Sequence, residues 1–183
     1  MSLTGKIFKL KTVFLITALI INHFAAKAQD KNTVYIFLSE TCPICKSATL
    51  ELNKLNNEYS QLGYEFVGIF PNENVSNETT RNSFSKKYKL QFPLIADTNQ
   101  QYKQRFNAKI TPEVIVWNET KQKVIYRGKI DNSFESIGKR RTITTAFYLR
   151  NALESIQKND SESITFTEPV GCFIQTKNKE HEN

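Results

Sequence analysis

Apolar runs and helix-like patterns alternate along most of the chain. Short runs rich in apolar and β-branched residues are typical of strands, whereas apolar positions three or four residues apart are typical of amphipathic helices. The pattern predicts strands at residues 33–38, 64–70, 92–96, 113–117 and 123–130. It predicts helices at residues 46–61, 78–88, 99–106 and 142–157. This alternation predicts an α/β fold in which helices pack on a sheet.

Two segments differ from the rest of this pattern. Residues 33–38 are hydrophobic almost throughout, as expected of a central strand that is covered on both faces. From Lys158 onward the sequence is mostly polar, except for the stretch Glu168-Pro-Val-Gly-Cys-Phe-Ile174. We expect this apolar stretch to pack on another part of the protein, because exposed apolar segments are costly in water.

The first 28 residues have the pattern of a secretory signal. Lys6, Lys9 and Lys11 precede an apolar stretch at residues 13–21, and Ala26-Lys27-Ala28 is typical of a cleavage site. Residues 13–21 are too few to span a bilayer, although retention of the leader as a membrane anchor is the alternative. Cleavage after Ala28 would make the protein periplasmic or secreted, and its cysteines would then lie in an oxidising compartment.

The positive charge of the chain belongs largely to this leader. The full sequence has 25 Lys and Arg against 18 Asp and Glu, for a formal net charge of +7. Lys6, Lys9, Lys11 and Lys27 would leave with the leader, so the mature protein would be only weakly basic. No nucleic-acid partner is therefore expected, and no stable membrane insertion after cleavage.

The candidate chemistry lies in Cys42-Pro43-Ile44-Cys45, between the first predicted strand and the first predicted helix. A Cys-x-x-Cys in this position is typical of a dithiol that makes and breaks a disulfide. Pro43 suits the first position of a helix, and the positive end of the helix dipole stabilises a thiolate. Lys46 adds positive charge nearby. Cys42 is therefore the candidate nucleophile and Cys45 the resolving cysteine.

Other uses of the motif fit the sequence less well. A zinc site would need further ligands, but the two histidines are His23, in the leader, and His181, in the polar tail. Covalent haem attachment would need a histidine at position 46, which is Lys46. An inert structural disulfide remains an alternative. The sequence thus lacks the further ligands that a zinc site or a covalently attached haem would need.

The order of elements, together with Cys42-Pro-Ile-Cys45 and a later Thr111-Pro112, resembles the thioredoxin fold. The extra helix and strand at residues 78–96 resemble the insertion of the exported TlpA/ResA-like branch of redoxins. The resemblance implies a central mixed sheet flanked by helices, with the inserted helix–strand unit. It divides the chain into a signal peptide (residues 1–28), a thioredoxin-like domain (residues 29–158) and a C-terminal tail (residues 159–183) that carries Cys172.

The resemblance also implies a function. The chain is expected to be a thiol–disulfide oxidoreductase that needs no cofactor, exchanging its disulfide with cysteine-containing protein substrates and a redox donor. The peptide bond before Pro112 would be cis, and the backbone at Thr111 would pair with the substrate's extended chain. Two alternatives stay open: a Sco-like copper-handling protein that binds Cu(I), and a peroxiredoxin-like thiol peroxidase.

The chain departs from the family pattern around the motif. Thr41 stands where thioredoxins have a tryptophan, and Lys46 to Thr49 lack the glutamate of the TlpA/ResA branch. The proton acceptor for Cys45 is therefore unassigned. Glu40 and Glu113 are candidates by proximity, and a solvated charge is the simpler interpretation of each.

Cys172 is an odd third cysteine in a chain with an export signal. Such a residue suggests intermolecular pairing or a free reactive thiol. Three hypotheses are compatible with its apolar surroundings. The tail could fold back so that Cys172 exchanges with the Cys42–Cys45 disulfide. The three sulfurs could bind Cu(I). Alternatively, the tail could dock on the sheet with a passive thiol.

Overall fold

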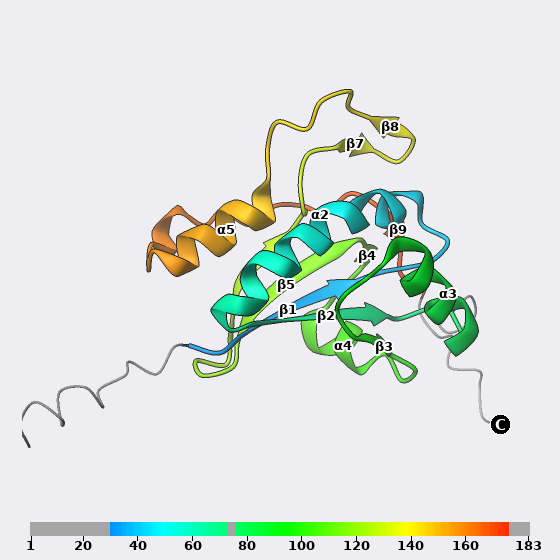
Figure 1. Cartoon of the computed structure of the whole chain (residues 1–183), viewed down its shortest axis with the longest axis horizontal. Helices are drawn as coiled ribbons and strands as arrows, with labels where there is room; N and C mark the ends of the chain where they lie inside the picture. Colours follow the sequence, from blue (N-terminus) through cyan, green and yellow to red (C-terminus); the bar gives the residue numbers. More distant parts are fainter. Residues whose placement is uncertain (1–29, 73–75, 176–183) are drawn as a thin grey trace, which may run out of the picture.

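The apolar run at residues 33–38 forms the central strand of a sheet in the computed structural model, which describes residues 30–72 and 76–175 (Figure 1). Within these residues a five-stranded sheet has the order β3-β2-β1-β5-β6. Its strands are β1 (Asn32–Phe37), β2 (Tyr64–Phe70), β3 (Leu94–Ala96), β5 (Glu113–Asn118) and β6 (Lys123–Gly128). The leader lies outside the described residues.

The sheet is mixed, because β1 runs parallel to one neighbour and antiparallel to the other. It pairs parallel with β2 from Asn32↔Tyr64 to Phe37↔Ile69. On its other side it pairs antiparallel with β5, with Phe37 opposite Glu113. This arrangement brings the end of β1, which leads into the Cys-x-x-Cys motif, next to the start of β5, which directly follows Pro112. The predicted thioredoxin-type architecture is thereby confirmed.

Alternate residues of β1 enter two different cores. Val34, Ile36 and Leu38 lie in a core on the face covered by α2 (Pro43–Tyr59), α3 (Glu78–Tyr88) and α5 (Tyr148–Gln157). Tyr35 and Phe37 lie in a core on the opposite face, which is covered by α4 (Gln101–Phe106) (Figure 1). Both faces of the strand are thus buried, which explains why the run lacks the alternation of a half-exposed strand.

The helix boundaries follow local sequence signals in two cases. Pro43 is the first residue of α2, with Cys42 at the N-cap, as predicted. Helix α3 begins after Asn77, whose side chain accepts a hydrogen bond from the backbone N–H of Thr80. The Thr80 hydroxyl in turn accepts from the N–H of Asn77. This reciprocal capping fixes the start of α3 at the predicted residue.

The last helix is shorter at its N-terminus than predicted. It begins at Tyr148 rather than at residue 142. The Asn132 side-chain oxygen accepts hydrogen bonds from the backbone N–H groups of Thr145 and Ala146, and the Asn132 N–H donates to the Ala146 carbonyl. These bonds hold the segment against a distant loop, so its backbone groups are not available to a helix.

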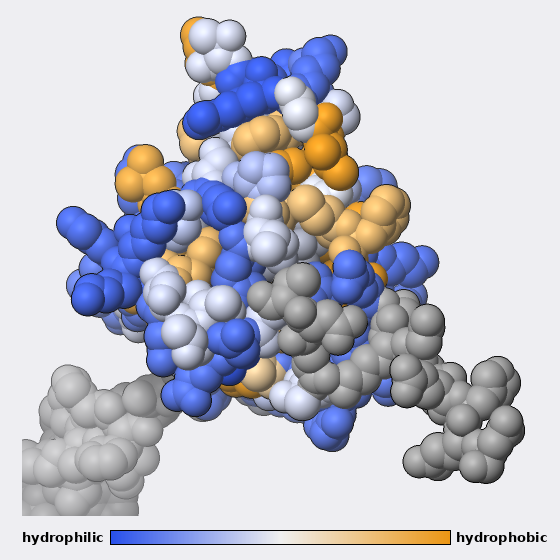
Figure 2. Space-filling model, turned by 90° about the vertical axis from the view of Figure 1, so that its right-hand side faces the viewer, coloured by the Kyte–Doolittle hydropathy of each residue, from blue (hydrophilic) through white to orange (hydrophobic). Residues whose placement is uncertain are grey.

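The last described segment returns to the sheet. Residues 167–175 run along the domain, and β9 (Cys172–Phe173) pairs antiparallel with β4 (Ile110–Thr111) (Figure 1). On the face shown in Figure 2, hydrophilic side chains cover most of the surface and hydrophobic ones form small groups between them. Among residues 30–72 and 76–175, no helix has the length and hydrophobicity required to cross a bilayer.

Candidate functional site

The candidate nucleophile, Cys42, lies at the end of the loop that connects β1 to α2. Cys42 is the N-cap residue of α2, and its carbonyl accepts the hydrogen bond from the Lys46 N–H that opens the helix. No acidic residue lies in the first turn of α2, so nothing there opposes the positive end of the helix dipole. Only 1% of Cys42 and none of Cys45 is exposed. The dithiol is therefore covered in this structure.

Three segments meet at the Cys42 sulfur. The Cys42 Sγ lies 3.2 Å from the carbonyl oxygen of Thr111 and 2.8 Å from the Sγ of Cys172. All three cysteines are free thiols. The structure therefore brings together most of the predicted site residues, and the C-terminal Cys172 lies in contact with the first cysteine of the motif.

The three thiols have very different acidities. Hydrogen bonds from the Cys45 and Cys172 thiols lower the pKa of Cys42 from 9.0 to about 5, the bond from Cys45 being the stronger cause. Burial, followed by the hydrogen bond to Cys42 and the charge of its thiolate, raises the pKa of Cys45 well above its ordinary value. The same causes raise the pKa of Cys172 to about 12. Of the three cysteines, Cys42 is therefore the one whose thiolate the site favours, with the Cys45 and Cys172 thiols as donors to it.

The segment opposite the dithiol is Thr111-Pro112, whose peptide bond is cis, as the resemblance implied. Thr111 is fully buried and belongs to β4. Its backbone pairs with β9, with Thr111 opposite Cys172 and Ile110 opposite Phe173. The edge at which a substrate chain was expected to pair is thus occupied by the C-terminal segment of the same chain.

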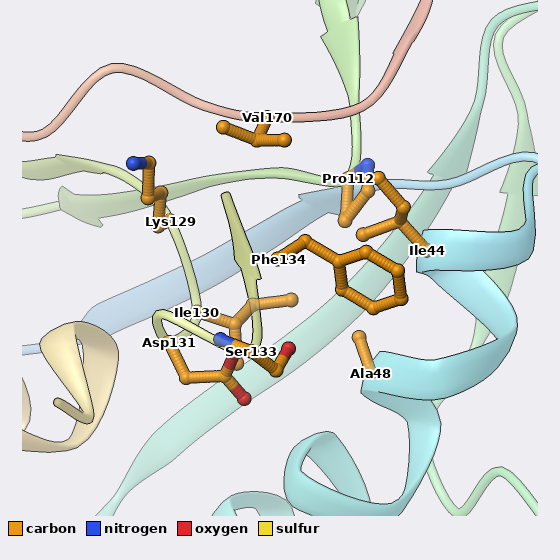
Figure 3. Close-up of a pocket in the computed structure, with 9 residues that line it drawn as sticks. All are labelled: Ile44, Ala48, Pro112, Lys129, Ile130, Asp131, Ser133, Phe134 and Val170. Carbon is orange, nitrogen blue, oxygen red and sulfur yellow. Dashed lines mark hydrogen bonds between the residues drawn. The ribbon is translucent and has the colours of Figure 1, made fainter. Parts of the chain in front are cut away.

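A small pocket adjoins the motif (Figure 3). Its residues come from α2, from the cis-proline segment, from the chain after β6 and from the C-terminal segment: Ile44, Ala48, Pro112, Lys129, Ile130, Asp131, Ser133, Phe134 and Val170. The Phe134 ring points toward Ile44 and Ala48 (Figure 3). Most of these residues were missed by sequence analysis, because only the fold brings such distant segments together.

The two glutamates considered as proton acceptors are not simple solvated charges. Glu113 is only 4% exposed and lies 3.2 Å from the Arg127 guanidinium; burial raises the pKa of its carboxyl group. Glu40 accepts hydrogen bonds from the hydroxyl groups of Ser76 and Thr80, at 2.6 and 2.9 Å. Both carboxylates thus have fixed partners in the fold, and the proton acceptor for Cys45 stays unassigned.

The basic cluster formed by Lys139, Arg140 and Arg141 adjoins the pocket, because the Arg140 guanidinium lies 5.9 Å from the centroid of the Phe134 ring. Lys139 and Arg140 form β8, which pairs with β7 (Phe134–Ser136). Lys139 and Arg141 form exposed ion pairs with Glu135.

Within the described ranges, no group of three or more His, Cys, Asp or Glu side chains is arranged to hold a metal ion.

Solved structures share this fold. An uncharacterised conserved protein from Geobacillus kaustophilus matches 82% of this chain and 79% of its own, with 24% identity and a TM-score of 0.71. A hypothetical protein from Sinorhizobium meliloti matches 82% of both chains, with 22% identity and a TM-score of 0.70. StoA from Bacillus subtilis matches 69% of this chain and 84% of its own, with 16% identity and a TM-score of 0.51.

Sequence comparison gives the family. The thiol–disulfide oxidoreductase ResA of Halalkalibacterium halodurans is 28% identical over 91 residues, which are 50% of this chain and 50% of ResA. The chain thus spans about half the length of that relative. The redoxin family model matches residues 11–140, a range that includes the Cys-x-x-Cys motif and Thr111-Pro112 but not Cys172. This chain belongs to the redoxin family.

Proposed function

We propose that the protein is an exported thiol–disulfide oxidoreductase that exchanges its Cys42–Cys45 disulfide with cysteines of partner proteins. The observation that carries this proposal is that a thiol with a lowered pKa lies beside a buried thiol with a raised pKa. Hydrogen bonds lower the pKa of Cys42 to about 5, whereas burial keeps Cys45 protonated. Such a pair separates the attacking thiolate from the resolving thiol. Membership of the redoxin family and similarity to ResA support it.

In the reducing direction, the Cys42 thiolate attacks one sulfur of a substrate disulfide. The substrate S–S bond breaks, a Cys42–substrate bond forms, and the other substrate sulfur leaves as a thiolate. Cys45 then loses its proton and attacks the Cys42 sulfur. The Cys42–Cys45 disulfide forms, and the second substrate sulfur leaves and takes up a proton. A redox donor would return the protein to its dithiol form by the same steps in reverse order.

Substrate recognition would use the backbone of β4 and the pocket beside it. An extended substrate segment can pair with Thr111 as β9 does here, because backbone pairing at a strand edge is independent of side-chain sequence. The pocket beside Ile44, Ala48 and Phe134 would receive a neighbouring side chain of the substrate. Export would rest on the leader pattern of residues 1–28.

The test is reduction of a disulfide-containing protein, such as insulin, by full-length protein supplied with dithiothreitol. The wild type should accelerate the reaction, and Cys42→Ser should abolish the acceleration. Cys45→Ser/Cys172→Ser, which lacks both neighbouring thiols, should accumulate a mixed disulfide with the substrate when it is first reduced and then freed of dithiothreitol. Undiminished activity of Cys42→Ser would overturn the proposal. A redox titration then gives the direction of electron flow: a potential near about −270 mV indicates a reductant and one near about −120 mV an oxidant.

A further inference from the structure

The C-terminal segment is attached to the fold upstream of Cys172. We call residues 167–175 the strap. The Thr167 N–H donates to the Arg127 carbonyl at 3.0 Å. The Thr167 hydroxyl accepts from the Lys129 N–H at 2.8 Å and lies 3.1 Å from the Tyr126 hydroxyl. These bonds fix the strap beside the end of β6.

The strap is also attached downstream of Cys172. The Ile174 N–H donates to the Lys109 carbonyl at 2.8 Å, and the Ile174 side chain is buried in the core on the α4 face. The Gln175 N–H donates to the Asn72 side-chain oxygen at 2.9 Å. Because both ends of the strap are held, the position of Cys172 between them is defined by the fold.

Between these attachments the strap lies against the cis-proline segment. β9 pairs with β4, and the Thr111 hydroxyl donates to the Cys172 carbonyl at 3.4 Å. The strap therefore has the geometry expected of a bound substrate strand, with its cysteine directed at Cys42. The sulfur–sulfur distance of 2.8 Å leaves no room for another molecule between them.

We propose that Cys172 is a third redox thiol of this site, presented to Cys42 by the strap as an internal substrate, and that the two form a disulfide in exchange with Cys42–Cys45. This inference rests on the proposed function and extends it. The observations that carry it are the contact between the two sulfurs, the strand pairing beside them and the attachment of the strap at both ends.

The exchange step needs no outside oxidant. The Cys172 sulfur loses its proton and attacks the Cys42 sulfur of the Cys42–Cys45 disulfide. The Cys42–Cys172 bond forms, the Cys42–Cys45 bond breaks, and Cys45 leaves as a thiolate that takes up a proton. One disulfide and one thiol are present before and after the step. Burial and the Cys42 thiolate raise the pKa of Cys172 in the dithiol state; the charge of that thiolate is gone once Cys42 is oxidised.

The Cys42–Cys172 disulfide would have a consequence for substrates. It would fasten the strap over β4, so the edge proposed for substrate pairing would stay closed until Cys45 attacks Cys42 and releases Cys172. A substrate would compete with the strap for both the strand edge and the Cys42 sulfur. Cys172 would thus regulate access to the dithiol.

The cysteine spacing allows a direct test by tryptic mapping without reduction. Cys42 and Cys45 lie in one tryptic peptide, residues 32–46, and Cys172 lies in another, residues 159–177. A Cys42–Cys45 disulfide leaves the first peptide alone, with the loss of two hydrogens. A bond to Cys172 joins the two peptides. Full-length wild type, Cys45→Ser and Cys42→Ser are equilibrated over a series of glutathione ratios, alkylated at low pH and digested.

We expect joined peptides in monomeric Cys45→Ser as its main oxidised form, and joined peptides in the wild type at intermediate ratios. Cys42→Ser should give at least about tenfold less of them, because the fold presents Cys172 to Cys42 and not to Cys45. Adding Gly171→Val to Cys45→Ser should reduce their yield by a similar factor. If the wild type forms only the disulfide within residues 32–46 and Cys45→Ser forms no joined peptide, the inference is overturned. Absence of the disulfide within residues 32–46 would instead contradict the proposed function.

Discussion

Gly171 approaches Thr111 so closely that a Cβ added to the glycine would lie 2.0 Å from the Thr111 carbonyl oxygen. The same Cβ would lie 3.0 Å from the Cδ of Pro112. No ordinary side chain fits these distances, because both neighbours belong to a buried segment with little room to shift. The close approach of the strap to the cis-proline segment therefore depends on the glycine.

Gly171→Val should lift the strap from β4. We expect the free energy of unfolding to fall by about 1–3 kcal/mol, the usual cost of overpacking, and alkylation of Cys42 by iodoacetamide to accelerate because its sulfur becomes exposed. Urea denaturation and timed mass spectrometry measure the two effects. Phe173→Ala is the matched control, since Phe173 lies in the same strap but is 77% exposed and should change stability by less than about 0.5 kcal/mol. Equal effects of both substitutions would contradict this account.

The Cys42 thiolate should persist in mildly acidic solution. Absorbance near 240 nm reports thiolate, and in the reduced protein it should fall as the pH decreases through about 5, the lowered pKa of Cys42. The signal should be absent from Cys42→Ser. Cys172→Ala removes one hydrogen bond to the thiolate and should raise this midpoint by about one pH unit. A midpoint near 9 in the wild type would contradict the hydrogen-bond account.

The same lowered pKa predicts a pH dependence of stability. Between about pH 5 and 9 the unfolded state binds a proton at Cys42 that the folded state does not, so the contribution of this thiol to stability rises with pH over that window. It is lost as the pH falls through about 5. The measurement is the difference in unfolding free energy between reduced wild type and Cys42→Ser at several pH values; a difference that decreases as the pH rises would argue against it.

Phe134→Ala should weaken recognition of protein substrates without changing the dithiol. The ring forms one wall of the pocket beside the motif, and the loss of its apolar contact is expected to lower kcat/KM for a protein disulfide by about tenfold. Reaction with a small disulfide, such as oxidised glutathione, should be unchanged. Ile143→Ala serves as the control, because Ile143 is 71% exposed and does not line that pocket. If Phe134→Ala lowered kcat/KM equally for the protein disulfide and for oxidised glutathione, the Phe134 ring would act on the exchange reaction and not on substrate recognition.

Arg150 should stabilise the contact between α5 and α2. Its guanidinium lies 3.1 Å from Glu51 and 2.6 Å from Glu58, which are both on α2. We expect Arg150→Ala to lower the unfolding free energy by about 1 kcal/mol, and less at high salt because the charges are then screened. Lys158→Ala, which removes an exposed pair at 3.9 Å, should have no measurable effect. Urea denaturation at two salt concentrations compares the unfolding free energies of the two variants. If the loss of stability in Arg150→Ala did not depend on salt, Arg150 would stabilise the contact by packing and not by its charge.

Local sequence patterns by themselves determine most of the framework. The strand at residues 64–70 and the helix at residues 78–88 have the predicted boundaries, because apolar runs, capping residues and prolines act within a few residues. The position of Cys42 at a helix start depends on the proline beside it. The predicted start of the last helix was wrong, since Asn132, which lies in a separate loop, binds the backbone before it.

The site itself depends on tertiary structure. Cys42 and Cys172 are 130 residues apart in sequence, and no periodicity or spacing rule places one against the other. Their contact results from the packing of Ile174 in a core and from the space that Gly171 leaves beside Thr111. The sequence alone indicates that three sulfurs are available. Only the folded chain decides that Cys172 touches Cys42, because such long-range contacts depend on the shape of the whole core.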